Sequence, residues 1–555
     1  MSAKYSIGID FGTNSVRAII VNIANGAEIA TSVFNYPTGD KGVVIDAKNP
    51  DLARQHPKDY LDGTTATVTD ALRQAAATPG FSPADVVGIG VDTTGSTPLP
   101  VNANGVPLAL TDAFRGDPNA MAWLWKDHTG HAEAAEITAL AARMRPNYLA
   151  KCGGTYSSEW FWSKLLRFKR VAPEAFAATH TWVEHADWMT GVLTGTDHPS
   201  VIKRCVCAAG HKAMFNPGWG GYPDAEFIGA LDADLVRIQQ TLPATAYDVA
   251  DAAGGLTAKW AAKLCLAEGL PVAMGAFDAH LGAVGSGIRP GVLVKIIGTS
   301  CCDMMVAPLD QDVPDVPGLC GIVPESILPG CFGFEAGQSA VGDIFNWFVS
   351  GMRPEGETHE SLTAKAAALK PGESGLIALD WHNGNRTVLV DQRLTGAVLG
   401  MTLHTRPEEI YRALIEATAF GARVIMERFI EYGVPVERIV NCGGISGKNA
   451  LLMQIYADVM GRPLEISASS QTCAVGAAMA GAVASGAHKD FDAAAAAMVR
   501  VDEKVYTPNP ENERVYGKLF AVYKRLHDSF GVRGHQEGLF GVMKDLLVLR
   551  DAARA

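Results

Sequence analysis

Residues 10–17 read D-F-G-T-N-S-V-R and form a polar turn between two apolar segments. Residues 5–9 before the turn and 16–21 after it predict two strands of a hairpin. A carboxylate at a strand end, followed by glycine and small hydroxyl residues, suits a hydrated Mg²⁺ beside phosphate groups. We therefore expect Asp10 to hold a metal ion, while Arg17 either adds positive charge there or forms a surface salt bridge.

The turn Gly298-Thr299-Ser300 repeats this pattern about half a chain length later. Residues 293–297 before it are mostly apolar, interrupted by Lys295, and residues 304–306 after it are apolar. Two Gly-Thr turns, each between apolar strands, indicate an internal duplication. The second turn predicts another set of phosphate donors.

Strands and helices alternate along the rest of the chain, which predicts the α/β class. Further strands are expected at 86–91, 376–379 and 438–441, and a long helix over 406–432, where apolar residues recur at steps of three and four. Thr405 and Glu408 predict a capping box for this helix. A glycine-rich stretch at 282–291 places the domain boundary, giving domains 1–288 and 289–555 with a ligand cleft between them.

Residues 442–449, C-G-G-I-S-G-K-N, come close to a P-loop but do not match it. Cys442 replaces the first glycine, and Asn449 replaces the hydroxyl residue that binds Mg²⁺. Paired glycines at Gly443 and Gly444 would let a flat ring approach the backbone. A plain strand-to-helix turn is the alternative.

A phosphoryl acceptor needs a base, and Asp278 is the candidate. It lies between apolar neighbours beside the predicted boundary, where loss of solvent would raise its proton affinity. His280 is expected to pack or to form a hydrogen bond nearby. Lys212 and Glu335 stand among glycine and aromatic residues, which suggests partial burial and a need for partners, against the alternative of solvated surface charges. Residues 92–97 add several small hydroxyls.

Composition and charge narrow the class of protein and the kinds of partner. The 555 residues are 48% hydrophobic and 19% charged with a net charge of −12, as in globular proteins, which argues against nucleic acid or an anionic membrane as the main partner. Ten cysteines without framework spacing indicate reduced thiols and a cytoplasmic chain. Residues 473–488 are uncharged until the final histidine but too short to cross a bilayer, so they predict a buried helix.

Together these segments resemble the FGGY carbohydrate kinases, which are actin-like ATPases. The resemblance also rests on G-V-D-T-T-G-S-T-P, Y-S-S-E-W-F-W-S-K, A-G-H-K, G-A-F-D-A-H and E-A-G-Q-S-A-V-G-D-I, and it covers nearly the whole chain. It implies two ribonuclease-H-like lobes with the active site in the cleft. It also implies ATP-dependent phosphorylation of L-ribulose to L-ribulose 5-phosphate in L-arabinose catabolism, with Mg²⁺.

The same resemblance implies a role for each motif residue. Asp278 is the general base, and Asp10 serves the metal. The other assignments are the ketopentose site (Ser96, Lys212, Asp278, Glu335), the phosphate turns (Gly12, Thr13, Asn14, Arg17, Gly298, Thr299) and the adenosine site (Gly443, Gly444, Asn449). At Ser96 the sugar contact is expected through the side chain or the backbone.

Three alternatives remain open at this stage. The chain is a D-ribulose kinase or another pentulose or pentitol kinase, a non-sugar actin-like ATPase, or a metabolite-binding repressor built on a sugar-kinase fold, although the acidic charge disfavours the repressor. The oligomeric state is also open, with a homodimer as one alternative.

Overall fold

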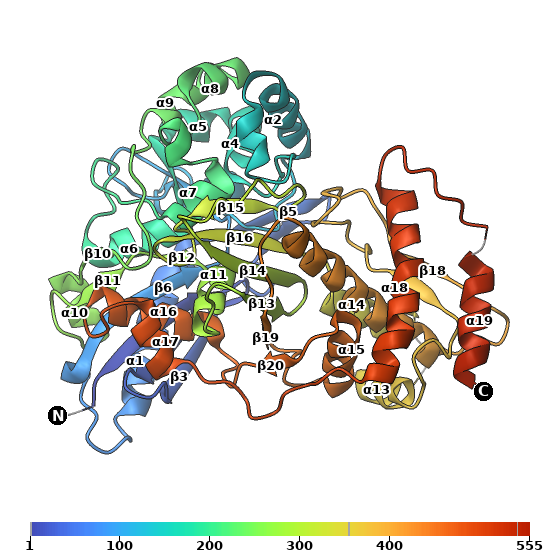
Figure 1. Ribbon diagram of the computed structural model, residues 1–555. Coiled ribbons are helices and arrows are strands. Elements are labelled where there is room, and N and C mark those ends of the chain that lie inside the picture. Colours follow the sequence, from blue (N-terminus) through green and yellow to red (C-terminus); the bar gives the residue numbers. More distant parts are fainter. Residues whose placement is uncertain (1–2, 353–355, 541, 555) are drawn as a thin grey trace.

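The computed structural model describes residues 3–352, 356–540 and 542–554, and it contains two α/β lobes, each built on a mixed sheet (Figure 1). The first sheet has the strand order β10-β11-β6-β1-β2-β3, and β12 also pairs with β6. Its strands are β1 (Tyr5–Phe11), β2 (Ser15–Asn22), β3 (Glu28–Asn35), β6 (Val86–Thr93), β10 (Ala252–Gly255), β11 (Pro271–Ala273) and β12 (Ala276–Phe277).

The second sheet has the strand order β15-β16-β14-β13-β19-β20. Its strands are β13 (Val292–Ile297), β14 (Cys301–Pro308), β15 (Gly321–Pro324), β16 (Cys331–Gln338), β19 (Arg438–Cys442) and β20 (Leu464–Ile466). The strands expected around both Gly-Thr turns and at 438–441 are therefore present.

The two sheets repeat one topology. β1 pairs antiparallel with β2 and parallel with β6, and β13 pairs antiparallel with β14 and parallel with β19. A third antiparallel strand lies beside the second strand of each hairpin, β3 next to β2 in the first sheet and β16 next to β14 in the second. This confirms the internal duplication and the α/β class with two ribonuclease-H-like lobes.

Two helices cross closely where the lobes meet. α11 (Asp278–Gly285) packs on α16 (Thr472–Ala484), and α16 also lies against β1 and β6 of the first sheet. A Cβ at Gly476 would lie 1.8 Å from the Leu281 carbonyl oxygen, so only glycine permits this crossing. The expected buried helix at 473–488 is confirmed in this position. The boundary at 288/289 stays a prediction, since α16 follows it in sequence yet covers the first sheet.

A helical unit with its own aromatic core extends from the first lobe, at the top of Figure 1. Trp123, Trp162 and Trp182 are fully buried in this core. The unit and its neighbouring short strands comprise β4 (Val44–Asp46), β5 (Asn49–Gln55), β7 (Pro98–Val101), β8 (Ala122–Trp123), β9 (Thr181–Glu184), α2 (His131–Met144), α3 (Pro146–Ala150), α4 (Phe161–Val171), α5 (Pro173–Ala178), α7 (Val206–Ala213), α8 (Ala225–Leu231) and α9 (Leu235–Gln239). α6 (His185–Thr194) follows β9 and packs against the first sheet. α7 contacts β15, so this unit reaches the second lobe.

The remaining helices and strands pack on the two sheets or on one another. They are α1 (Pro57–Ala75), α10 (Ala258–Leu264), α12 (Gly342–Trp347), α13 (His359–Ala367), β17 (Ile377–Leu379), β18 (Ala397–Leu399), α14 (Pro407–Glu431), α15 (Ala450–Met460), α17 (Phe491–Met498), α18 (Pro510–Gly531) and α19 (Val542–Arg554). The long helix α14 was expected, but its capping box was placed wrongly. The N-cap is Arg406, directly before Pro407 in the first turn, and only half of a capping box is present: the Arg406 N–H donates to Glu409 Oε2 over 2.8 Å, whereas the guanidinium has no acceptor to offer in return.

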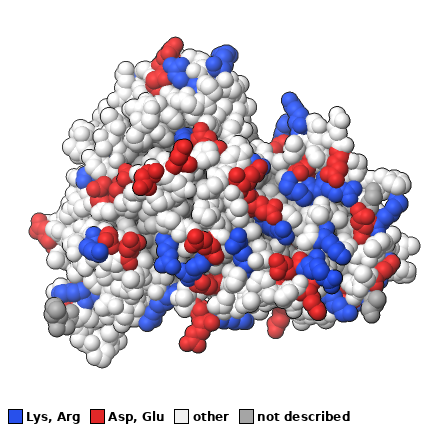
Figure 2. Space-filling model, in the orientation of Figure 1, with Lys and Arg blue, Asp and Glu red and all other residues white. Residues whose placement is uncertain are grey.

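Acidic and basic side chains are interspersed on the face shown in Figure 2. Among the described residues, every helix is either too short or too polar to cross a lipid bilayer.

Candidate active site

The two Gly-Thr turns open onto one cavity between the lobes. Thr13 of the first turn and Ser300 of the second both line this cavity of about 140 Å³, together with Asp278. Each turn is closed by its own backbone: the Gly12 N–H donates to the Ser15 carbonyl over 2.9 Å, and the Gly298 N–H donates to the Ser300 carbonyl over 2.8 Å. The structure thus brings together two segments that are nearly 300 residues apart in sequence.

The surrounding residues fix both turns. The indole N–H of Trp125 donates to Thr13 Oγ1 over 3.0 Å, and the Gln55 side-chain amide donates to the Thr13 carbonyl over 2.7 Å. The Thr299 carbonyl accepts the Val341 N–H just before α12, over 2.9 Å. Asn14, in contrast, is exposed and donates to the Lys41 carbonyl, away from the cavity.

Three carboxyl groups gather at the strand ends of the first sheet. Asp10 on β1 pairs in register with Asp92 on β6, and Asp92 pairs with Ala276 on β12, two residues before Asp278. Burial, followed by repulsion from Asp10, raises the pKa of Asp278 to about 7. Burial, followed by repulsion from Asp10 and Asp278, raises the pKa of Asp92 well above its usual range. Burial also raises the pKa of Asp10.

This set of three aspartate carboxyl groups is suited to a divalent cation. Both carboxyl oxygens of the fully buried Asp92 lack a hydrogen-bond donor among the described residues, and Arg17 Nη1 lies 3.2 Å from Asp10 Oδ2. One arginine balances only part of the charge of three carboxylates. Oxygen-only groups of this kind are the ligands, direct or through water, that Mg²⁺ prefers. The assignment of Asp10 to the metal stays a prediction that this donor set suits.

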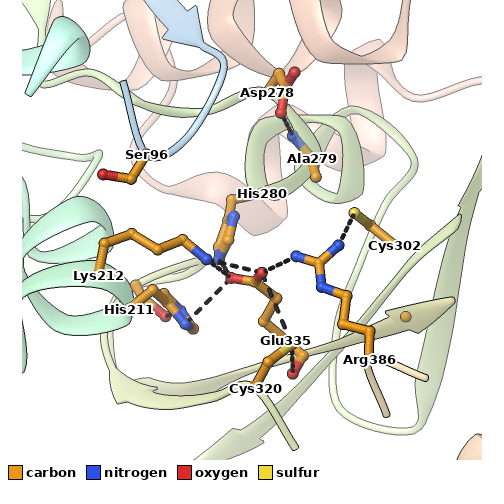
Figure 3. A network of polar contacts seen from close by, with 12 residues as sticks. Ser96, His211, Lys212, Asp278, Ala279, His280, Cys302, Cys320, Glu335 and Arg386 are labelled. Carbon is orange, nitrogen blue, oxygen red and sulfur yellow. Dashed lines mark hydrogen bonds and ion pairs between the residues drawn. The ribbon is translucent and has the colours of Figure 1, made fainter. Parts of the chain in front are cut away.

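Glu335 on β16 is the centre of a buried ion cluster (Figure 3). Lys212 Nζ on α7 lies 2.9 Å from both carboxylate oxygens, and Arg386 Nη2 approaches Oε1 from the opposite side at 2.7 Å. His211 Nδ1 and His280 Nε2 lie 3.4 and 3.8 Å from Oε2. These partners offset the burial of Glu335 and hold the pKa of its carboxyl well below the usual range, Lys212 contributing most.

The cluster links the lobes beside Asp278. Lys212, Glu335, Arg386 and Asp278 all line the same cavity. His211, His280 and Glu335 lie within 4.8 Å of one another, a spacing that a metal ion can bridge. Two cations already contact this carboxylate, so repulsion disfavours a further cation there. The arrangement instead offers charged donors and an acceptor to a polar neutral molecule.

Ser96 does not turn its hydroxyl toward the cavity. Its Oγ donates to Glu184 Oε1, and in Figure 3 it points away from the Glu335 cluster. Its neighbours Thr94 and Gly95 line the cavity instead. A sugar contact through the hydroxyl of Ser96 therefore has no support in this geometry, and a contact through the backbone stays a prediction.

A larger cavity of about 820 Å³ opens between α12, α13 and the start of α15. Gly444 and Asn449 line it together with Gly342 and Tyr411. Gly443 has φ +93° and packs against the Ile297 carbonyl, directly before the second turn. Asn449 Oδ1 accepts the Leu452 N–H over 3.0 Å and caps α15, as expected for a helix beginning there. Gly342 connects this cavity to the second turn, because its N–H donates to the Gly298 carbonyl over 3.0 Å.

Sequence reasoning missed several residues that line the central cavity or lie buried next to it. Arg386 lies in irregular chain between β17 and β18 and belongs to no motif. Asp92 was assigned only to a hydroxyl-rich segment, although its position directly after an apolar strand was the same signal that identified Asp10. Glu159 and Cys302 also line the cavity.

Comparison with known proteins covers both lobes. Residues 5–285 match the N-terminal domain of the FGGY family of carbohydrate kinases, and residues 293–485 match its C-terminal domain. A ribulokinase of Geobacillus thermodenitrificans is 44% identical, covering 100% of this chain and 99% of the relative. A ribulokinase of Vibrio parahaemolyticus is 40% identical, covering 94% and 95%.

Solved structures agree on the fold. A xylulose kinase from Rhodospirillum rubrum superposes with a TM-score of 0.74 at 24% identity, covering 95% of this chain and 99% of that one. A glycerol kinase from Plasmodium falciparum superposes with a TM-score of 0.75 at 14% identity, covering 96% and 99%. The two-lobed architecture is thus shared with carbohydrate kinases of low sequence identity.

Proposed function

Because the chain belongs to the FGGY family of carbohydrate kinases, we propose that it phosphorylates L-ribulose to L-ribulose 5-phosphate with ATP, a step of L-arabinose catabolism. The observation that carries the substrate is the 44% identity to a ribulokinase over the full length of both chains. The meeting of two glycine turns and Asp278 in one cavity supports the chemistry.

In this proposal Asp278 is the general base. Its carboxylate accepts the proton of the terminal sugar hydroxyl as that oxygen attacks the γ-phosphorus in line with the departing ADP. A pKa of about 7 makes it a stronger proton acceptor than an ordinary aspartate, while leaving it mostly ionised in mildly alkaline solution. The transition state is loose, so the protein contributes mainly by positioning and by charge stabilisation.

The two cavities divide the substrates between them. The phosphates lie against Gly12, Thr13 and Arg17 on one side and Gly298 and Thr299 on the other, whereas Asn14 is turned to Lys41. The adenosine lies in the cavity beside Gly443, Gly444 and Asn449. Lys212 and Glu335 hold the ketopentose hydroxyls, with a backbone contact at Ser96. When bound, Mg²⁺ neutralises charge on the phosphates, and Asp10 is the residue that would hold it, next to Asp92. Because the proposed reaction consumes ATP, we place the protein in the cytoplasm.

Rival functions share the phosphate turns but differ in the acceptor. The deciding experiment measures ADP release with L-ribulose, D-ribulose, the two xyluloses and ribitol, and without any sugar. We expect release to require a ketopentose, with the highest kcat/KM for L-ribulose and a phosphate ester on its terminal carbon by NMR. Preference for another pentulose or a pentitol would transfer the assignment to that substrate, and sugar-independent turnover would favour a non-sugar ATPase.

A further inference from the structure

A fully buried lysine stands behind the wall of the central cavity. Lys164 on α4 donates from Nζ to three backbone carbonyls, those of Ser96 at 2.8 Å, Leu124 at 2.9 Å and Trp123 at 3.2 Å. Three acceptors match the three hydrogens of an ammonium group. The carbonyls belong to two separate segments, one after β6 and one at the end of β8.

A buried carboxylate meets the first of these segments from another direction. Glu184, at the end of β9, accepts the hydroxyl of Ser96 at Oε1 and the Thr97 N–H at Oε2 over 2.9 Å. Ser96 therefore binds Lys164 through its carbonyl and Glu184 through its side chain. Burial lowers the pKa of Lys164 and raises that of Glu184, and the opposite charge of each partner counteracts the shift of the other, so each ion depends on the compensation that this arrangement provides.

Both segments continue directly into the cavity wall. Thr94 and Gly95, immediately before Ser96, line the cavity with Asp278, and so does Trp125, immediately after Leu124. The indole of Trp125 in turn holds Thr13 of the first phosphate turn. Lys164 thus joins the wall on the proposed sugar side to the residue that fixes the phosphate turn. The side-chain hydrogen bonds of Glu184 to described residues go instead to Ser96 and Thr97 of the sugar-side segment.

We propose that Lys164 and Glu184 are positioning residues, which set the spacing between the Thr94–Gly95 wall and Trp125 through Ser96 and the backbone. The inference rests on the proposed function, because it concerns how the same cavity holds its two substrates. Removal of either ion frees a segment of the wall and leaves the other ion buried without its compensation. Misplacement of about 1 Å in such a wall lowers catalysis by up to about 10²-fold.

The asymmetry between the two ions gives the test. Glu184→Gln keeps the shape of the side chain and is expected to raise the KM for L-ribulose about tenfold or more, with the KM for ATP within twofold of wild type. Lys164→Met is expected to raise both KM values, because it frees Trp125 as well. Lys169→Met is the matched control: it removes a partly exposed lysine from the same helix, where Lys169 pairs with Asp232 and Asp234. It is expected to leave both KM values unchanged.

A double-mutant cycle tests the route through Ser96. If the hydroxyl acts by holding Glu184, Ser96→Ala combined with Glu184→Gln will raise the KM for L-ribulose no more than either change alone. Additive effects, or equal rises of both KM values in Glu184→Gln, would overturn the inference, as would wild-type kinetics in Glu184→Gln. Glu184→Gln keeps the test decisive if Lys164→Met does not fold. Failure of the proposed function would appear separately, as wild-type protein that does not phosphorylate L-ribulose.

Discussion

Lys212 Nζ lies 2.9 Å from both carboxylate oxygens of Glu335, and this pair joins α7 of the helical unit on the first lobe to β16 of the second. Both side chains are about 3% exposed, so each charge depends on the other. The same two residues are the proposed contacts of the ketopentose. The sugar would therefore bind where the lobes are already in ionic contact, and its affinity is tied to the interface between them.

Substitutions in this pair should affect the stability of the fold and the affinity for the sugar in different ways. Lys212→Met leaves Glu335 with Arg386 and two histidines, and breaking a buried pair costs about 3–5 kcal/mol of unfolding free energy. We expect a lower Tm and a KM for L-ribulose at least tenfold higher, with the KM for ATP nearly unchanged. Lys212→Met combined with Glu335→Gln should recover part of the Tm but none of the sugar affinity. Equal rises in both KM values would assign the pair a structural role alone.

The role of Asp278 predicts a loss of chemistry without a loss of binding. Asp278→Asn removes the proton acceptor but keeps the side-chain shape, so kcat should fall by roughly 10²–10⁴-fold. L-Ribulose and ATP should still bind with near wild-type Kd by calorimetry. The exposed Asp310→Asn serves as the control and should leave kcat unchanged. Near-normal turnover in Asp278→Asn would exclude this residue as the base.

The pKa of Asp278 also predicts the pH dependence of the reaction. The base must be ionised, and its pKa of about 7 is well above the ordinary 3.8. Activity should therefore rise with pH, with kcat/KM for L-ribulose increasing about tenfold per pH unit below 7 and levelling off above it. The measurement is a pH profile of kcat/KM from pH 5 to 9 at saturating ATP. A level profile down to pH 5 would show that the base has an ordinary pKa.

The raised pKa of Asp278 predicts that the stability of the folded protein falls with pH, whereas its activity rises. In the folded protein the carboxyl of Asp278 holds its proton up to about pH 7, while in the unfolded chain it releases the proton near 3.8. This group therefore lowers stability progressively as the pH rises from about 4 to 7. The Tm of Asp278→Asn should exceed that of wild type, by a margin that grows between pH 5 and pH 8. A constant margin would contradict the raised pKa.

The sequence predicted the features that depend on local order. The turns at Gly12 and Gly298 were identifiable because each lies between two apolar strands, and a hairpin brings its turn to a sheet edge whatever surrounds it. The pairing of Asp10 with Asp92 could not be predicted, because it depends on the register between strands about 80 residues apart.

The direction in which a side chain points was the second feature that the sequence could not predict. The segment around Ser96 was correctly placed at the end of a strand, but its hydroxyl turns to Glu184, which lies 88 residues away in sequence. Arg386 reaches Glu335 from irregular chain, where neither periodicity nor a turn motif constrains its position. Both cases depend on tertiary packing, which a single sequence does not encode in any local pattern.

The adjacent glycines of the proposed adenosine site should respond differently to the same methyl group. A Cβ on Gly444 would have no heavy atom within 4 Å and would project beside the 820 Å³ cavity. Gly444→Ala should therefore keep the wild-type Tm, while the KM for ATP rises roughly tenfold because the methyl occupies space needed by the nucleoside.

Gly443 provides the matched comparison. It has φ +93°, and a Cβ there would lie 2.4 Å from the Ile297 carbonyl oxygen. Gly443→Ala should therefore lower the Tm and affect both substrates, since Ile297 leads directly into the second phosphate turn. A thermal scan with the two KM values for each variant makes the comparison. If Gly444→Ala binds ATP as tightly as wild type, the nucleoside does not lie against this segment, and the larger cavity is not the adenosine site.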